Sequence, residues 1–190
     1  MKRLLSLLLA LALTLPLLTA PALAEDGERD VRVAKYTAFV DETLAAGDLK
    51  YRVDEDDPTR FILTYSPKDG RLGDIYVFID IYGGGALIWA SYEDDLPPEA
   101  VDEAIRYVNL VNGRLLGRKY YIFPNTGSVI YELYFFMDVD SLGDYETRML
   151  LGLLDSIVID IDYDTEYFVA VINGETADNA FAMYEADLEN

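Results

Sequence analysis

The spacing of apolar and polar residues predicts an amphipathic helix near the start of the chain. Between positions 31 and 46, apolar residues recur at intervals of three and four, which places them on one face of a helix. These residues are Val33, Tyr36, Val40 and Leu44. Gly47 follows the run as a candidate C-terminal cap, so we expect the helix to end there.

Four runs of alternating or strongly β-prone residues follow, and turn residues separate them. The runs cover 49–53, 60–66, 74–82 and 86–92. In the third run, Ile75 and every second residue after it are aliphatic, whereas Tyr76, Phe78 and Asp80 fall on the opposite side. The connections are short, which favours an antiparallel meander.

A second helix is expected from Pro97 or Pro98 to Asn112, because proline is tolerated in a first helical turn. Asn112 falls near the centre of the apolar stripe, where a polar group needs a hydrogen-bond partner. We therefore expect its amide to tie the helix end to the chain that enters the next strand. Gly113 would close the helix in the left-handed conformation, and Asn109 would lie at the stripe's edge.

A hairpin and a long helix are expected in the last third of the chain. Gly127 lies in the hairpin turn, at a position that tolerates positive φ. A helix is expected to start near Asp144. In its continuation over 158–172 the β-branched residues favour a strand, but the helical spacing of Leu150, Leu154, Ile157 and Ile161 favours a helix. We predict a helix that ends before Gly174, with a short further helix in the tail. The hairpin strands would cover 118–123 and 128–137.

These elements predict an α+β fold. A meander of three or four strands and a hairpin would form a single twisted antiparallel sheet, with three main helices packed on it. The predicted organisation is a signal peptide at 1–24, a polar leader at 25–32, the α+β domain at 33–173 and a C-terminal tail at 174–190.

The first 24 residues have the pattern of a cleaved secretory signal peptide. A basic start precedes an apolar run from Leu4 to Leu15, and Ala22 and Ala24 occupy the −3 and −1 positions before an acidic stretch. The alternative is an uncleaved membrane anchor, but the segment is barely long enough to span a bilayer and contains two prolines. We expect a secreted or periplasmic protein without stable membrane insertion after cleavage.

Charge and composition exclude several functions. The chain has a net charge of −20, which repels phosphates, so nucleic acid is not an expected partner. It contains neither cysteine nor histidine, which removes Cys–His and Ser–His nucleophile systems and the two best zinc ligands. Carboxylate, lysine, tyrosine or serine chemistry remains, and no cofactor is expected.

The acidic segment from Asp160 to Glu166 is a weak candidate for calcium binding. Asp160, Asp162 and Asp164 match the first three ligand positions of an EF-hand loop. Thr165 then replaces the required glycine, and Val171 replaces the bidentate glutamate. A solvated or capping acidic face is the preferred interpretation, and no metal ligand is assigned.

An aromatic surface is the stronger candidate for a binding site. If helices cover one face of the sheet, Tyr76 and Phe78 lie on the other, with Trp89 or Tyr131 beside them. Exposed aromatic patches usually mark partner surfaces. The alternative is that a later helix or the tail covers these four side chains.

The order of elements resembles the YbjN-type domain family, over about residues 33–173. The shared features are the helix in "LPPEAVDEAIRYVNLVN", the hairpin in "GRKYYIFPNTGSVIYE" and the leucine-rich helix in "RMLLGLLDSI". That family has a type III secretion chaperone-like fold, and its members are described as bacterial sensory-transduction regulators. The resemblance implies protein–protein interaction and self-association, and no defined catalytic activity.

Together these observations predict an exported, non-catalytic protein-binding or regulatory domain of the YbjN type, for which a homodimer is one candidate state. No catalytic residue is assigned. The alternative is a small carboxylate-dependent hydrolase that acts on cell-envelope polymer, which would require two facing carboxylates in a cleft.

Overall fold

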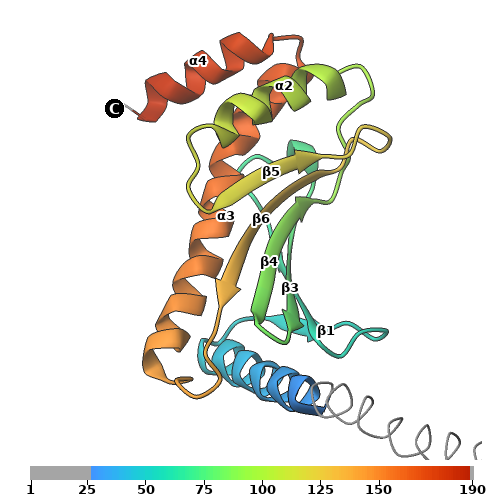
Figure 1. Ribbon diagram of the computed structural model, residues 1–190. Coiled ribbons are helices and arrows are strands. Elements are labelled where there is room, and N and C mark those ends of the chain that lie inside the picture. The colour runs from blue at the N-terminus through green and yellow to red at the C-terminus, as the bar shows by residue number, and fades with distance from the viewer. Residues whose placement is uncertain (1–26, 189–190) are drawn as a thin grey trace, which may run out of the picture.

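One open antiparallel sheet of six strands forms the centre of the computed structural model, which describes residues 27–188 (Figure 1). In space the strands follow the order β1-β2-β3-β4-β6-β5. The first four strands form the predicted meander, and the hairpin joins it because β6 pairs with β4. The strands are β1 (Tyr51–Val53), β2 (Arg60–Tyr65), β3 (Ile75–Tyr82), β4 (Gly85–Tyr92), β5 (Arg118–Ile122) and β6 (Val129–Phe136).

Four helices pack around this sheet in the described part of the chain. They are a first helix over residues 27–46, α2 (Val101–Asn112), α3 (Asp144–Ile172) and α4 (Ala177–Leu188). The long α3 runs along the sheet, the first helix lies at one end of the molecule, and α2 and α4 lie at the other (Figure 1). The predicted α+β class is confirmed, and α4 is the helix expected in the tail.

The core lies between α3 and one face of the sheet. The aliphatic residues of β3 at Ile75, Val77 and Ile79 are fully buried, as the alternation predicts. Each large aliphatic side chain that is fully buried contributes about 1.5–3 kcal/mol through the hydrophobic effect. The same alternation directs the remaining side chains of β3 and β4 away from α3.

The β-branched segment of α3 is helical, as its spacing predicts. Leu150, Leu154, Ile157 and Ile161 fall on one face and are at most 1% exposed. Burial of this continuous stripe outweighs the intrinsic preference of valine and isoleucine for strands, which is a small effect per residue.

Several predicted boundaries need correction. The helix expected from Pro97 begins at Val101, after a turn in which the N–H of Ala100 donates to Pro97 O. Gly113 is not left-handed: its φ of −66° and ψ of −16° continue the helical conformation. After the first helix, the positive φ belongs to Asp48 and not to Gly47.

The structure tests only part of the predictions for the N-terminal segment, because it describes residues 27–188. The signal peptide predicted at 1–24 lies outside the described residues. Residues 27–32, predicted as a polar leader, belong to the first helix, and their side chains are exposed. Within residues 27–188, no helix combines the length and the apolar character needed to cross a membrane.

Candidate functional site

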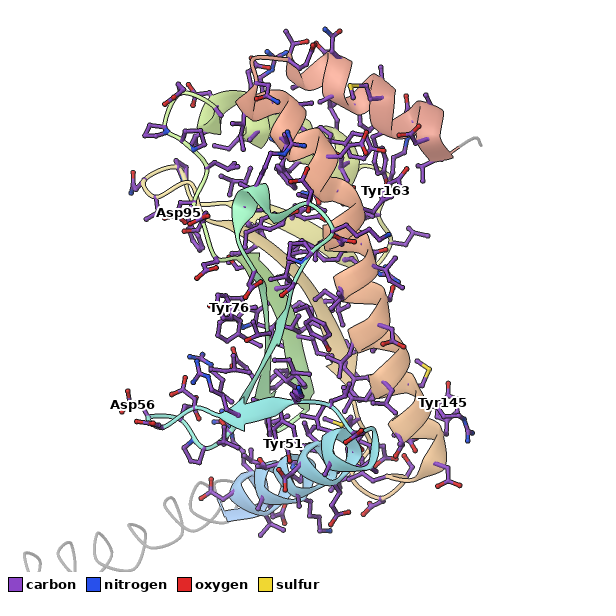
Figure 2. All side chains as sticks on the ribbon, turned by 180° about the vertical axis from the view of Figure 1, so that it is seen from behind. Tyr51, Asp56, Tyr76, Asp95, Tyr145 and Tyr163 are labelled. Carbon is purple, nitrogen blue, oxygen red and sulfur yellow. The ribbon has the colours of Figure 1, made fainter. Side chains whose placement is uncertain are left out.

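The face of the sheet opposite α3, here called the open face, carries the predicted aromatic residues. Figure 2 shows Tyr76 on the side turned away from α3. Phe78 of β3 lies opposite Trp89 of β4 in the strand register, and their rings stack with centroids 3.8 Å apart. The structure therefore brings Tyr76, Phe78 and Trp89 together on one face, as the alternation predicts.

The polar groups in the middle of the open face are paired with one another. The guanidinium of Arg60 donates to both oxygens of Asp80, at 2.6 and 3.3 Å, and Nε1 of Trp89 donates to Asp80 Oδ2 at 2.9 Å. Further along, Nζ of Lys119 lies 3.3 Å from Glu132 Oε1. Arg60 Nη1 also lies 3.8 Å from Asp54 Oδ2, so both cations of this region are paired with carboxylates of the same chain.

The most exposed aromatic side chains of this face lie on its hairpin side. We call Tyr121, Phe123, Tyr134 and Phe136 the aromatic strip, in which Tyr121 and Phe123 lie beside the start of β6 and Tyr134 and Phe136 lie at its end. Phe136 is 76% exposed and Tyr134 is 49% exposed, and their rings are 6.3 Å apart at an interplanar angle of 16°. The sequence already places large side chains on both faces of β6, but alternation alone cannot tell which face the helices cover.

Tyr131 does not belong to the open face, which corrects the prediction that it could join Trp89. It is fully buried on the α3 side, because it sits at an odd position of β6, in phase with the buried Val129 and Leu133. Its hydroxyl donates to Asp160 Oδ2 at 2.9 Å, and burial raises its pKa. Asp160 also pairs with Arg118, so this carboxylate joins α3 to both hairpin strands.

A second polar cluster surrounds the buried carboxyl of Asp164. The Tyr120 hydroxyl donates to Asp164 Oδ2, whereas Asp164 Oδ1 and the Tyr107 hydroxyl have no hydrogen-bond partner among the described residues. Tyr92 and Tyr184 lie near enough to interact electrostatically with this carboxyl, so the four tyrosines come from β4, α2, β5 and α4. Removal from water raises the pKa of Asp164 to about 7.

The EF-hand alternative fails on geometry, because Asp160, Asp162 and Asp164 lie within the continuous helix α3 and not in a loop. Within residues 27–188, no group of three acidic side chains is arranged to hold a metal ion. The preferred interpretation as a solvated face is also wrong for Asp164, which is only 4% exposed. Asp162 accepts the backbone N–H of Lys68 at 2.9 Å.

Asn112 has the structural role that the sequence predicts. Its Nδ2 donates to Tyr120 O at 2.9 Å, and its Oδ1 accepts the N–H of Tyr120 at 2.7 Å. The side chain thus satisfies both backbone groups of Tyr120 on the outer side of the edge strand β5. Unpaired groups of this kind would otherwise be available to another strand.

The substitution Asn112→Leu is expected to lower the free energy of unfolding by about 1–3 kcal/mol, because it leaves both backbone groups of Tyr120 without their partner. Asn109 is exposed, so Asn109→Ala should change the free energy of unfolding by less than about 0.5 kcal/mol. Urea titrations followed by circular dichroism would measure both values. Equal effects of the two substitutions would contradict this role of Asn112.

A surface groove of about 700 Å³ lies along the outer side of α3, near η1 (Gly70–Leu72) and α4. Its charged lining includes Lys68, Asp69 and Glu166. Hydrogen bonds from Arg71 lower the pKa of Asp69, whereas a general acid needs a raised pKa. Asp164, the carboxyl whose pKa is raised, does not line this groove, which contains Asp69, Asp162 and Glu166, and the hydrolase alternative stays a prediction.

Comparison with known proteins does not identify a family. No protein-family model matches the chain, and no curated protein shows significant sequence similarity to it. The resemblance to the YbjN-type family therefore stays a hypothesis, and function has to be argued from the surfaces of this molecule.

Proposed function

We propose that this chain is an exported, non-catalytic module that binds another protein through the aromatic strip on the open face. The single observation that carries the proposal is the pair of adjacent, largely exposed rings of Tyr134 and Phe136. Exposed aromatic side chains are enriched where proteins meet, because each buries a large area at a low cost in conformational entropy.

The charges around the strip indicate the chemistry of the partner. The charged side chains of the open face pair within the chain, so they add specificity more than long-range attraction. The remainder of the protein is strongly acidic. A partner with an apolar contact patch bordered by basic residues would fit both features, since the acidic surround would steer it toward the strip.

We also propose that the chain has the YbjN-type fold and a regulatory role. The arrangement of one antiparallel sheet with a long helix along it is compatible with a type III secretion chaperone-like domain. The signal-like N-terminus supports action outside the cytoplasm, in the periplasm or beyond the cell. On this proposal the protein needs no metal, cofactor or nucleic acid.

The double substitution Tyr134→Ser with Phe136→Ser is expected to weaken partner binding at least about tenfold and to leave the fold intact, since both side chains are exposed. The test captures partners from an extract of the producing cells and measures the affinity of the purified pair by calorimetry. Val31→Ser, at an exposed apolar site on the first helix, is the matched control. Equal binding by the double variant and the control would refute the proposal.

A further inference from the structure

A second apolar surface runs along the outer side of α3, away from the sheet. We call Tyr145, Met149, Gly152, Ser156, Ile159 and Tyr163 the outer stripe. These residues are spaced by four, three, four, three and four positions, the period of a helix that packs against another helix. Figure 2 shows Tyr145 near the start of α3 and Tyr163 further along the helix, both on the side turned away from Tyr76.

The outer stripe is more apolar than a helix of this fold requires. Tyr145 is 63% exposed and Ile159 is 66% exposed, and Met149 and Tyr163 are exposed as well. A different set of residues on α3 forms the core, and within the stripe only the Tyr163 ring has aromatic contacts inside the described part of the monomer, with Tyr167 and Tyr184. Every large exposed apolar side chain of α3 belongs to the stripe.

Gly152 lies in the middle of the stripe and is unfavourable within a helix. A Cβ added there would meet nothing within 4 Å, so the fold of the monomer does not require a glycine at this position. Small residues at the centre of a helix face allow a second helix to approach closely. Gly152 and the half-buried Ser156 supply such a centre.

The stripe is symmetric about Leu154. Gly152 and Ser156 lie two residues on either side, Met149 and Ile159 lie five residues away, and Tyr145 and Tyr163 lie nine residues away. Two copies of α3 that pack antiparallel about this point would therefore place Tyr145 opposite Tyr163. They would also place Met149 opposite Ile159 and Gly152 opposite Ser156. This self-complementarity is what a two-fold symmetric interface requires.

The groove beside Tyr163 completes the match. Its apolar lining includes Ile159, Tyr163 and Met183, and its volume is about 700 Å³. Tyr145 and Tyr163 lie about 27 Å apart along the helix. In antiparallel packing the second helix runs in the opposite direction, so Tyr145 of one copy lies beside Tyr163 and the groove of the other. Each copy thus offers one protruding ring and one groove.

We propose that two copies of this chain associate through antiparallel packing of their α3 outer stripes, with Tyr145 of each copy seated over the groove beside Tyr163 of the other. The two aromatic strips remain free in such a dimer, so one dimer presents two binding faces to its partner. The inference does not depend on the proposed function, because the aromatic strip lies on the opposite side of the molecule.

The first test is a concentration series in sedimentation velocity, in enough salt to screen the repulsion between two acidic chains. Ile159→Asp should raise the dimer dissociation constant at least about tenfold, because it buries a charge at the interface. Phe136→Asp, on the open face, should leave the dissociation constant unchanged. A wild-type protein that stays monomeric, or an Ile159→Asp variant that dimerises equally well, would overturn the proposal.

The second test uses the absence of native cysteine, because engineered thiols would be the only ones present. A mixture of Gly152→Cys and Ser156→Cys chains should form an intermolecular disulfide at least about tenfold faster than either chain alone, since only the mixed pair is directly opposed in antiparallel packing. If either single variant cross-linked as fast as the mixture or faster, antiparallel packing would be excluded. Parallel helices would give this result, because they place identical positions opposite each other.

Discussion

Replacing Asp164 by asparagine is expected to raise the free energy of unfolding by about 4 kcal/mol at pH 8 and by almost nothing at pH 4. The buried carboxyl has a pKa of about 7 in the folded protein, against an ordinary value of 3.8. Asparagine keeps the shape of the side chain, and its Oδ1 can accept the hydrogen bond from Tyr120. The substitution therefore removes the cost of a buried charge without removing the contact.

The sign follows from proton binding. Well below the ordinary pKa of 3.8 the carboxyl is protonated in the folded and unfolded states, so it carries no penalty. Between pH 4 and 7 the unfolded chain releases the proton while the folded protein keeps it, so stability falls as pH rises. Above the folded pKa of about 7 the full penalty is present. The difference between Asp164→Asn and wild type should therefore grow through this window and then level off.

Denaturant titrations at pH 4.5, about 6 and 8, followed by the fluorescence of the single tryptophan Trp89, would measure this difference. Asp57→Asn is the control. Hydrogen bonds from Thr59 lower the pKa of Asp57, so the stability that its carboxylate contributes is lost only below the ordinary aspartate pKa of 3.8. A constant difference between Asp164→Asn and wild type from pH 4.5 to 8 would show that Asp164 is not a buried, protonated acid.

The substitution Gly127→Ala is expected to destabilise the protein by about 3 kcal/mol or more, which is the second large effect. Gly127 has a φ of 84°, and an added Cβ would lie 2.4 Å from the carbonyl oxygen of Leu96. The N–H of Leu96 donates to Gly127 O, so this contact fastens the hairpin turn to the chain that leads into α2. The hairpin or the start of α2 would have to move to accommodate the methyl group.

Gly117→Ala separates the two causes of this effect. Gly117 has a similar φ of 72°, but nothing lies within 4 Å of an added Cβ. This variant should lose only the about 1–2 kcal/mol of left-handed backbone strain. Thermal unfolding of both variants would decide the question, and a Gly117→Ala loss as large as that of Gly127→Ala would show that the contact with Leu96 is unimportant.

Local patterns predicted most of the fold because each rests on a short-range rule. Alternation located the strands, and the spacing of Leu150, Leu154, Ile157 and Ile161 identified a helix despite their β-branched neighbours. The hydrogen bonds of Asn112 also followed from its place on the helical wheel. Gly113 was predicted wrongly because a glycine after a helix permits the left-handed conformation but does not impose it.

The burial of Tyr131 and Asp164 could not be read from the sequence, because it depends on contacts between distant elements. Both faces of β6 carry large side chains, so Tyr131 becomes a core residue only once α3 covers its side of the sheet. In the sequence Asp164 is one carboxylate of an acidic run, and only the packing of α3 against β4, α2, β5 and α4 buries it near their tyrosines. Such clusters are defined by topology and not by local spacing.

The central claim is that the aromatic strip contacts a different protein, and site-specific photo-cross-linking in the producing cells tests it most directly. Phe136→p-benzoylphenylalanine places the reactive group at the most exposed ring of the strip, and the same replacement at the exposed Glu55 is the control. We expect one dominant adduct with another protein from position 136 and none from position 55. No protein adduct from position 136, or the same adducts from both positions, would contradict it.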